Sequence, residues 1–178
     1  MSNDEAFVVT IDGPSGSGKG SLALQVAREL DFHLLDSGAI YRLLALKSIR
    51  QNADLDQENE VIAVLDDFDI DFEPGDELPV PFLDGQDVSA ELRQETMGEA
   101  ASRVARHAGV RRCLLDLQRS FFQPPGLVAD GRDMGTVVFP KARFKFFLNA
   151  SIEIRAQRRY KQLINMGLSA SIPQLQAD

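Results

Sequence analysis

Short apolar runs alternate along the chain with longer segments in which apolar residues recur every three or four positions. The short runs are typical of strands, and they lie at residues 7–11, 32–35, 126–130 and 144–148. The longer segments predict helices: one that ends near residue 30, one that begins at Ser37, two that span 90–106 and 110–122, and one that begins at Ser151. Strands separated by helices predict an α/β protein with a doubly wound parallel sheet, helices on both faces and a ligand at the carboxyl ends of the strands.

One segment interrupts this alternation. Residues 68–72 alternate between apolar and acidic side chains, as a half-buried strand does, and residues 80–83 form a second short apolar run. Pro74-Gly75-Asp76 and Asp84-Gly85 have the composition of turns. We therefore expect three regions: a first part of the core at 1–60, an inserted and mostly β lobe at 61–100, and a second part of the core at 101–178.

The composition is that of an ordinary globular protein. The chain has 178 residues, 44% of them hydrophobic, which is enough for one compact domain with a small appended lobe. It contains no apolar run of about 20 residues and no basic signal region. Its single cysteine, Cys113, has no internal partner for a disulfide. These features predict a cytoplasmic protein without a membrane partner.

The net charge of -8 is unevenly distributed. Residues 51–92 hold fourteen acidic and no basic residues, which leaves thirteen acidic against nineteen basic residues elsewhere. Phosphate sites respond to local charge, so the basic remainder is compatible with a phosphorylated ligand. We interpret the acidic block as a solvated face, and it argues against nucleic acid as a partner.

A glycine-rich segment directly follows the first apolar run and precedes a helical segment. It consists of Gly13, Pro14, Ser15, Gly16, Ser17, Gly18, Lys19, Gly20 and Ser21. Glycines let successive N–H groups face one centre, the helix adds its positive end, and Lys19 reaches the outer phosphates, so the segment predicts a phosphate-binding loop for a nucleotide. Gly20 stands where most such loops carry the Ser or Thr that binds magnesium, and Ser21 brings the hydroxyl one residue later. This variant is typical of nucleoside monophosphate kinases.

Two further motifs follow predicted strands. One runs from Leu35 to Arg42, and the other reads Asp130-Gly131-Arg132-Asp133. Arg42 and Arg132 offer planar forks suited to phosphate, and Asp130 ends its strand where phosphate-loop proteins place the acid that organises Mg²⁺. Together with the loop, these motifs resemble those of bacterial cytidylate kinases from about Val8 to the end of the chain.

The resemblance implies the substrates ATP and CMP or dCMP, with Mg²⁺ as cofactor near Ser21 and Asp130 through water. It implies a set of CMP-binding residues: Ser37, Arg42, Ser102, Arg111, Arg132 and Asp133. Asp133, Ser102 and Arg111 would recognise cytosine, whose amino group and ring acceptors suit a carboxylate and a guanidinium. The resemblance also implies a monomer at full length, and that Arg155, Arg158 and Arg159 lead into a lid over the ATP phosphates.

Such a reaction needs no general base. The acceptor is a phosphate monoester with a second pKa of about 6, so it is already an anionic nucleophile at neutral pH. Alignment and charge neutralisation then suffice, and we assign them to Lys19, Arg42, Asp130 and Arg132. Neither His33 nor His107 is assigned a catalytic role.

The chain departs from the family at its end. The family continues with an Arg- and Asp-rich lid, a last strand and a last helix, whereas this sequence stops at Asp178. That last strand would be the outer neighbour of residues 144–148. We expect a chain ending at Asp178 to be poorly soluble, to associate through this strand or to lack efficient turnover, unless the natural protein is longer.

Three alternatives stay open at this level. The chain could be a related kinase for AMP, UMP or a sugar acid. It could be a GTPase-like switch or a motor ATPase, although the guanine-reading Asn-Lys-x-Asp motif is missing and Gly131 stands where a motor would favour Glu. It could also be a fragment that binds nucleotide without catalysis.

Overall fold

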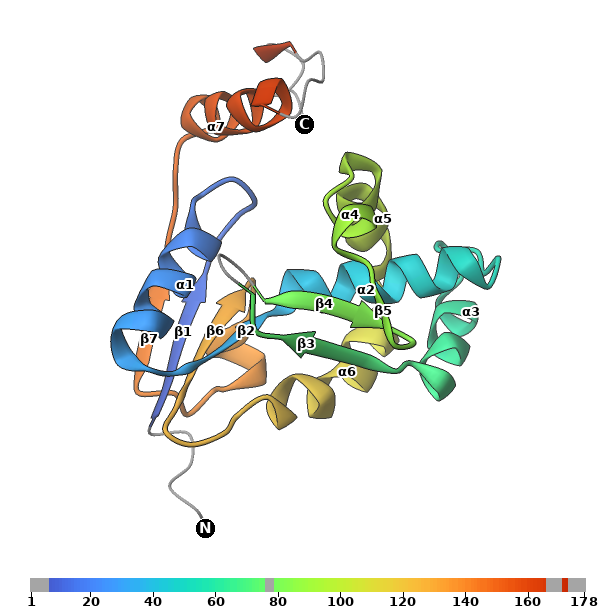
Figure 1. Ribbon diagram of the computed structural model, residues 1–178, viewed down its shortest axis with the longest axis horizontal. Helices are drawn as coiled ribbons and strands as arrows, with labels where there is room; N and C mark the ends of the chain where they lie inside the picture. Colours follow the sequence, from blue (N-terminus) through green and yellow to red (C-terminus); the bar gives the residue numbers. More distant parts are fainter. Residues whose placement is uncertain (1–6, 76–78, 166–170, 173–178) are drawn as a thin grey trace. The chain divides into compact units, whose positions relative to one another are not determined.

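The fold is described from a computed structural model, which covers residues 7–75, 79–165 and 171–172. The chain forms two compact units (Figure 1). The first unit combines Met1–Leu34 with Phe122–Asp178, and the second is Leu35–Phe121. The second unit is wider than the lobe expected at 61–100 and includes it, so the bounds of that lobe stay a prediction.

The core of the fold is a parallel sheet in the order β2-β6-β1-β7 (Figure 1). Its strands are β1 (Val8–Asp12), β2 (His33–Asp36), β6 (Leu127–Gly131) and β7 (Phe144–Phe147). In register, Ile11 lies opposite Asp130 on one side of β1 and opposite Phe146 on the other. All residues of β1 and β6 are buried, because these strands have a neighbour on each side.

Helices cover both faces of the two central strands, which confirms the doubly wound α/β architecture. Val9, Ile11 and Val128 pack against Ala23 and Ala27 of α1 (Lys19–Leu30). Thr10 alternates with Val9 and Ile11, so its side chain points to the other face, where the π-helix η3 (Met134–Val138) lies close to it. The last helix of this unit is α7 (Ile152–Asn165).

The strand β7 lies at the edge of the sheet that the structure describes. All four of its residues are exposed, and Phe147 is exposed to 71%. The opposite edge is β2, where only Leu35 is buried. The buried strand predicted at 32–35 is therefore wrong in its burial, because an outer strand has a neighbour on one side only.

The second unit is built around a largely buried helix, α2 (Ser37–Arg50). The other helices are α3 (Glu58–Ala63), η2 (Val64–Asp67), α4 (Ser89–Leu92), α5 (Glu95–Ala105) and α6 (Ala108–Ser120). The most extensive helix packing of this unit joins α2 to α5. None of the helices in the described part of the chain is long and apolar enough to cross a bilayer.

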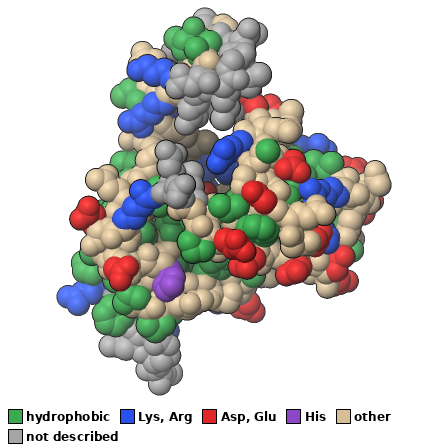
Figure 2. All heavy atoms as spheres, viewed as in Figure 1, with side chains coloured by type: hydrophobic (Ala, Val, Ile, Leu, Met, Phe, Trp, Pro, Cys, Tyr) green, Lys and Arg blue, Asp and Glu red, His purple; other side chains and the backbone are tan. Residues whose placement is uncertain are grey.

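The inserted strands form the antiparallel sheet β3-β4-β5, from β3 (Ile70–Glu73), β4 (Val80–Leu83) and β5 (Gln86–Asp87). β3 and β4 pair as the alternation predicted, and Asp84 and Gly85 make the turn into β5 with positive φ angles. The carboxylates of Asp66 and Asp71 are exposed, in line with a solvated acidic face (Figure 2).

Lys47 of α2 binds carboxylates of the β4–β5 turn and of the 3-10 helix η2 in this unit. Its side chain is only 7% exposed, and its Nζ lies 2.8 Å from Oδ1 of Asp84 and 3.3 Å from Oδ2 of Asp67. The hydrogen bond to Asp84 is the main cause that raises the pKa of Lys47 above its ordinary 10.5. The apolar stem of Lys47 is thus buried while its charge is neutralised by the β4–β5 turn and η2.

We expect Lys47→Met to lower the free energy of unfolding by about 1–2 kcal/mol at pH 8, since hydrogen bonds to charged groups contribute on this scale and the exposed partners reduce it. A raised pKa means that this contribution is fully present below pH 10.5 and is lost as pH rises through the folded value. Urea unfolding of both proteins should therefore give a difference that shrinks above pH 10.5. A difference that is unchanged there would contradict the assignment.

Helix α2 begins at Ser37, as predicted. Its cap is the extended residue Asp36, whose carboxylate accepts from the N–H of Ala39 at 3.1 Å. Asp is as strong a cap as Ser, and Ser37 is the first helical residue. The helix expected at 90–106 is two helices, α4 and α5, because α4 packs on β4 and α2 while α5 packs on α2 and α6.

Candidate active site

The loop from Gly13 to Gly18 joins the buried strand β1 to helix α1, as its motif predicted. Gly18 is the N-cap residue of α1 with φ 90°, a left-handed conformation that glycine adopts without strain. At Gly13 a Cβ atom would overlap the carbonyl oxygen of Leu148. The first helical N–H groups of α1 follow directly, so the loop has the backbone geometry of an anion site.

Lys19 and Asp130 come together at this loop. Lys19 is the first residue of α1, Asp130 lies near the carboxyl end of β6, and Nζ and Oδ1 are 3.7 Å apart. The side chain of Asp130 is 6% exposed and that of Lys19 is 18% exposed. The site therefore pairs a shielded carboxylate with a lysine that still reaches solvent.

Gly20 lies close to the same carboxylate. A Cβ atom at residue 20 would lie 3.2 Å from Oδ2 of Asp130, which is tighter than an ordinary van der Waals contact. A Ser or Thr at this position would require the carboxylate to shift by a few tenths of an ångström. Ser21, the next hydroxyl, is exposed on the first turn of α1.

Helix α7 brings arginines to the loop. Nη1 of Arg158 donates to the carbonyl oxygens of Ser17 and Gly16, at 2.5 and 3.3 Å. The Cβ of Arg155 lies 3.3 Å from the position that a Cβ of Gly16 would take. Of the three arginines predicted over the ATP phosphates, two thus contact the loop, and the side chain of Arg159 lies outside the described residues.

The predicted CMP-binding residues are divided between the two units. Arg132 and Asp133 follow β6 in the first unit, where Arg132 is exposed and Asp133 is half-buried. The other four lie in the second unit: Ser37, Arg42, Ser102 and Arg111.

In the second unit, Ser37 is buried and Arg42 is half-buried, one turn further along α2. A guanidinium nitrogen of Arg42 lies 3.5 Å from the position of a Cβ at Gly38. The hydroxyl of Ser102 donates to the carbonyl of Gly98 at 3.0 Å within α5. Arg111 lies on the first turns of α6, half-buried.

The sequence matches the family described as Cytidylate kinase over residues 9–178. The chain belongs to the cytidylate kinase family. This is a family of ATP-dependent phosphotransferases that act on CMP. Because the chain belongs to it, the alternatives of a GTPase-like switch and a motor ATPase are excluded. The family match thus agrees with the kinase family that the motif around Lys19 indicated.

Several cytidylate kinases are about half identical to this chain. That of Bordetella bronchiseptica is 53% identical over 173 residues, which are 97% of this chain and 76% of the relative. That of Paraburkholderia phytofirmans is 54% identical over 171 residues, or 96% and 73% of the two chains. That of Ralstonia nicotianae is 50% identical over 182 residues, or 100% and 77%.

The sequence analysis missed one residue that supports the candidate site. Asp12, the last residue of β1, is 7% exposed, and its two carboxylate oxygens accept from the N–H groups of Met134 and Gly135 at 2.8 and 2.9 Å. These are the first two residues of the π-helix that follows Asp133. Asp12 therefore fixes the segment that carries Arg132 and Asp133. The signal in the sequence was an acid at the end of a buried strand, as at Asp130.

Asp12→Asn should cost about 1–3 kcal/mol of stability, because the amide has one oxygen for two buried N–H donors and presents its own N–H₂ to the second. Urea unfolding measures this directly. Asp31→Asn is a suitable control, since Asp31 is exposed in the same unit. If both variants unfolded like the wild type, the two hydrogen bonds of Asp12 would not be needed to hold the π-helix.

Proposed function

We propose that this chain transfers the γ-phosphoryl group of Mg²⁺-bound ATP to CMP or dCMP, with the donor bound at the loop Gly13–Gly18. The observation that carries the proposal is the pairing of Lys19 with the shielded carboxylate of Asp130 at the start of α1. Family membership supports the same reaction.

On the donor side, backbone N–H groups of the loop and of the first turn of α1 hold the phosphate oxygens, and Lys19 supplies the charge. Arg158 already contacts the loop through Ser17 and Gly16, so α7 is anchored beside it. We assign Arg155, Arg158 and Arg159 to the outer phosphates, where charge accumulates as the phosphoryl group moves.

The residues present fit Mg²⁺ held mainly by phosphate oxygens and water. Mg²⁺ prefers oxygen ligands and binds proteins through one or two carboxylates. Asp130 supplies such a carboxylate and Ser21 a hydroxyl, while no cluster of three or more potential ligands occurs among the described residues. When bound, the ion neutralises charge on the phosphates, and we infer that Asp130 and Ser21 orient its water.

On the acceptor side, Arg42 and Arg132 bind the phosphate of CMP, with Ser37 at the start of the helix that carries Arg42. Asp133 accepts from the amino group of cytosine, and Arg111 and Ser102 contact its ring acceptors. No side chain has to remove a proton, because the attacking phosphate is already ionised at neutral pH. The protein's contribution is then to align the two nucleotides and to neutralise their charge.

The acceptor can be tested directly. ADP release should be measured with CMP, dCMP, UMP and AMP as acceptors, at equal ATP and Mg²⁺. CMP and dCMP should give the highest kcat/KM. A preference for AMP or UMP would contradict the assignment of the acceptor while leaving the donor site intact.

A further inference from the structure

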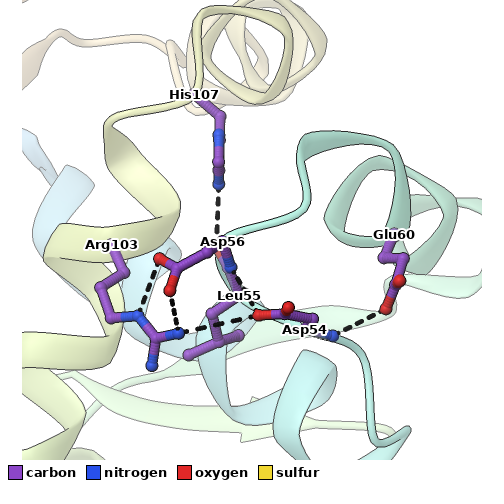
Figure 3. Close-up of polar contacts among 6 residues, drawn as sticks. All are labelled: Asp54, Leu55, Asp56, Glu60, Arg103 and His107. Atoms are coloured by element: carbon purple, nitrogen blue, oxygen red, sulfur yellow. Dashed lines mark hydrogen bonds and ion pairs between the residues drawn. The ribbon is translucent and has the colours of Figure 1, made fainter.

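The turn between α5 and α6 is held by the loop that joins α2 to α3, residues 51–57. Arg103 contacts this loop with both arms of its guanidinium: Nε lies 3.0 Å from Oδ1 of Asp56 and Nη2 lies 2.6 Å from Oδ2 (Figure 3). Nη2 also lies 3.8 Å from Oδ1 of Asp54. A two-armed pair of this kind fixes orientation as well as distance.

A second side chain, which lies in the turn itself, contacts the same loop. Nε2 of His107 lies 2.8 Å from the carbonyl oxygen of Leu55, between the two aspartates in sequence (Figure 3). A carbonyl oxygen only accepts, so Nε2 carries the proton in this contact. Leu55 itself is buried, so the loop is anchored from both sides.

The loop is also braced internally and at its end. The N–H of Asp54 donates to Glu60 at 2.8 Å, and that of Asp56 donates to Asp54 at 3.0 Å (Figure 3). Glu58, the first residue of α3, accepts from the N–H of Gly109 in α6. At Gly109 a Cβ would come within 2.9 Å of Glu58 and Ile62, so the first turn of α6 approaches α3 closely.

These contacts fix position more than they add stability. Arg103 and Asp56 are 40% and 62% exposed, and exposed ion pairs contribute little to folding. Their neighbours in sequence are informative. Ser102 precedes Arg103, and Arg111 lies one turn after His107, with its N–H donating to the His107 carbonyl at 3.1 Å. Any shift of the turn therefore moves Ser102 and Arg111.

We propose that Arg103 and His107 are positioning residues for CMP, which hold the α5–α6 turn on the loop 51–57 so that Ser102 and Arg111 are preset for the base. This inference rests on the proposed function, in which Ser102 and Arg111 contact cytosine. It adds a pair of residues that contact only protein and still set the affinity for the acceptor.

The test compares KM for CMP with KM for ATP in the full chain. Arg103→Met and His107→Leu should each raise KM for CMP about 3- to 10-fold and leave KM for ATP and the melting temperature nearly unchanged. His107→Gln keeps an N–H donor at the same reach and should restore most of the affinity. The double variant with Arg103→Met and Arg111→Met should have nearly the same KM for CMP as Arg111→Met alone, because both changes act through the same contact.

Arg50→Met is the matched control. It removes another exposed ion pair of this unit, that of Arg50 with Glu91 at 3.1 Å, and it should leave KM for CMP unchanged. If Ser102→Ala and Arg111→Met weaken CMP but Arg103→Met behaves like the control, the positioning role is overturned and the proposed function stands. If the wild type shows no CMP-dependent ADP release, the proposed function itself fails. Equal rises in both KM values would also overturn the positioning role.

Discussion

Lys19→Ala should nearly abolish phosphoryl transfer. We expect kcat to fall by about 10²- to 10³-fold or more while the fold is kept. Lys19 is the charged group of the loop that reaches solvent, 3.7 Å from the shielded carboxylate of Asp130. Removing one charge-stabilising group from a transition state typically has an effect of this size. ADP release with CMP as acceptor is the measurement.

The control for this variant is Lys161→Ala, which removes the same charge from an exposed position on α7. It should retain turnover, and both variants should melt like the wild type. Near-normal turnover by a folded Lys19→Ala protein would contradict the kinase assignment. A loss of folding in Lys19→Ala alone would instead show that its pairing with Asp130 is structural.

The features that could be predicted from the sequence are those with local signals. The phosphate loop needs glycines at fixed positions between a strand and a helix, and all three parts are consecutive in the chain. The β3–β4 hairpin is similarly local, since alternation and turn residues determine its register. For this reason the strand–loop–helix segment, the hairpin and the α/β class were predicted, and the structure confirms these three features.

The contacts that escaped prediction join residues far apart in sequence. Asp12 binds backbone N–H groups more than a hundred residues later, and Arg158 reaches back to Ser17. Neither pairing has a local pattern, because each depends on which strands and helices become neighbours. The break between α4 and α5 is similar: no glycine or proline lies there, and although both helices pack on α2, α4 also packs on β4 and α5 also packs on α6.

The roles of the acceptor residues remain proposals for a related reason. Ser102 and Arg111 would be unremarkable on helices α5 and α6 without the resemblance to cytidylate kinases. In the structure, the hydroxyl of Ser102 donates to the carbonyl of Gly98 in its own helix. The function of the acceptor residues is therefore best tested by comparing CMP with UMP as substrates. The clearest expected effect is that of a substitution at Asp133.

Asp133→Asn should reduce the preference for CMP over UMP about 10- to 100-fold in kcat/KM, equivalent to about 1–3 kcal/mol of base discrimination. Cytosine presents an amino donor to the carboxylate, whereas uracil presents an oxygen that a carboxylate repels. An Asn side chain can turn its amide to serve either base, so the variant should gain activity on UMP as well as lose it on CMP.

Asp31→Asn is the control for this change of charge. Asp31 is exposed in the same unit and has a positive φ of 54°, a conformation that Asn accepts as readily as Asp. The Asp31→Asn protein should have the same ratio of kcat/KM for CMP to kcat/KM for UMP as the wild type. If Asp133→Asn left the ratio unchanged too, Asp133 would not be the residue that reads the base. Because the backbone carbonyl of Asp133 accepts from Val137 at 2.8 Å whatever its side chain is, the substitution should leave the π-helix in place.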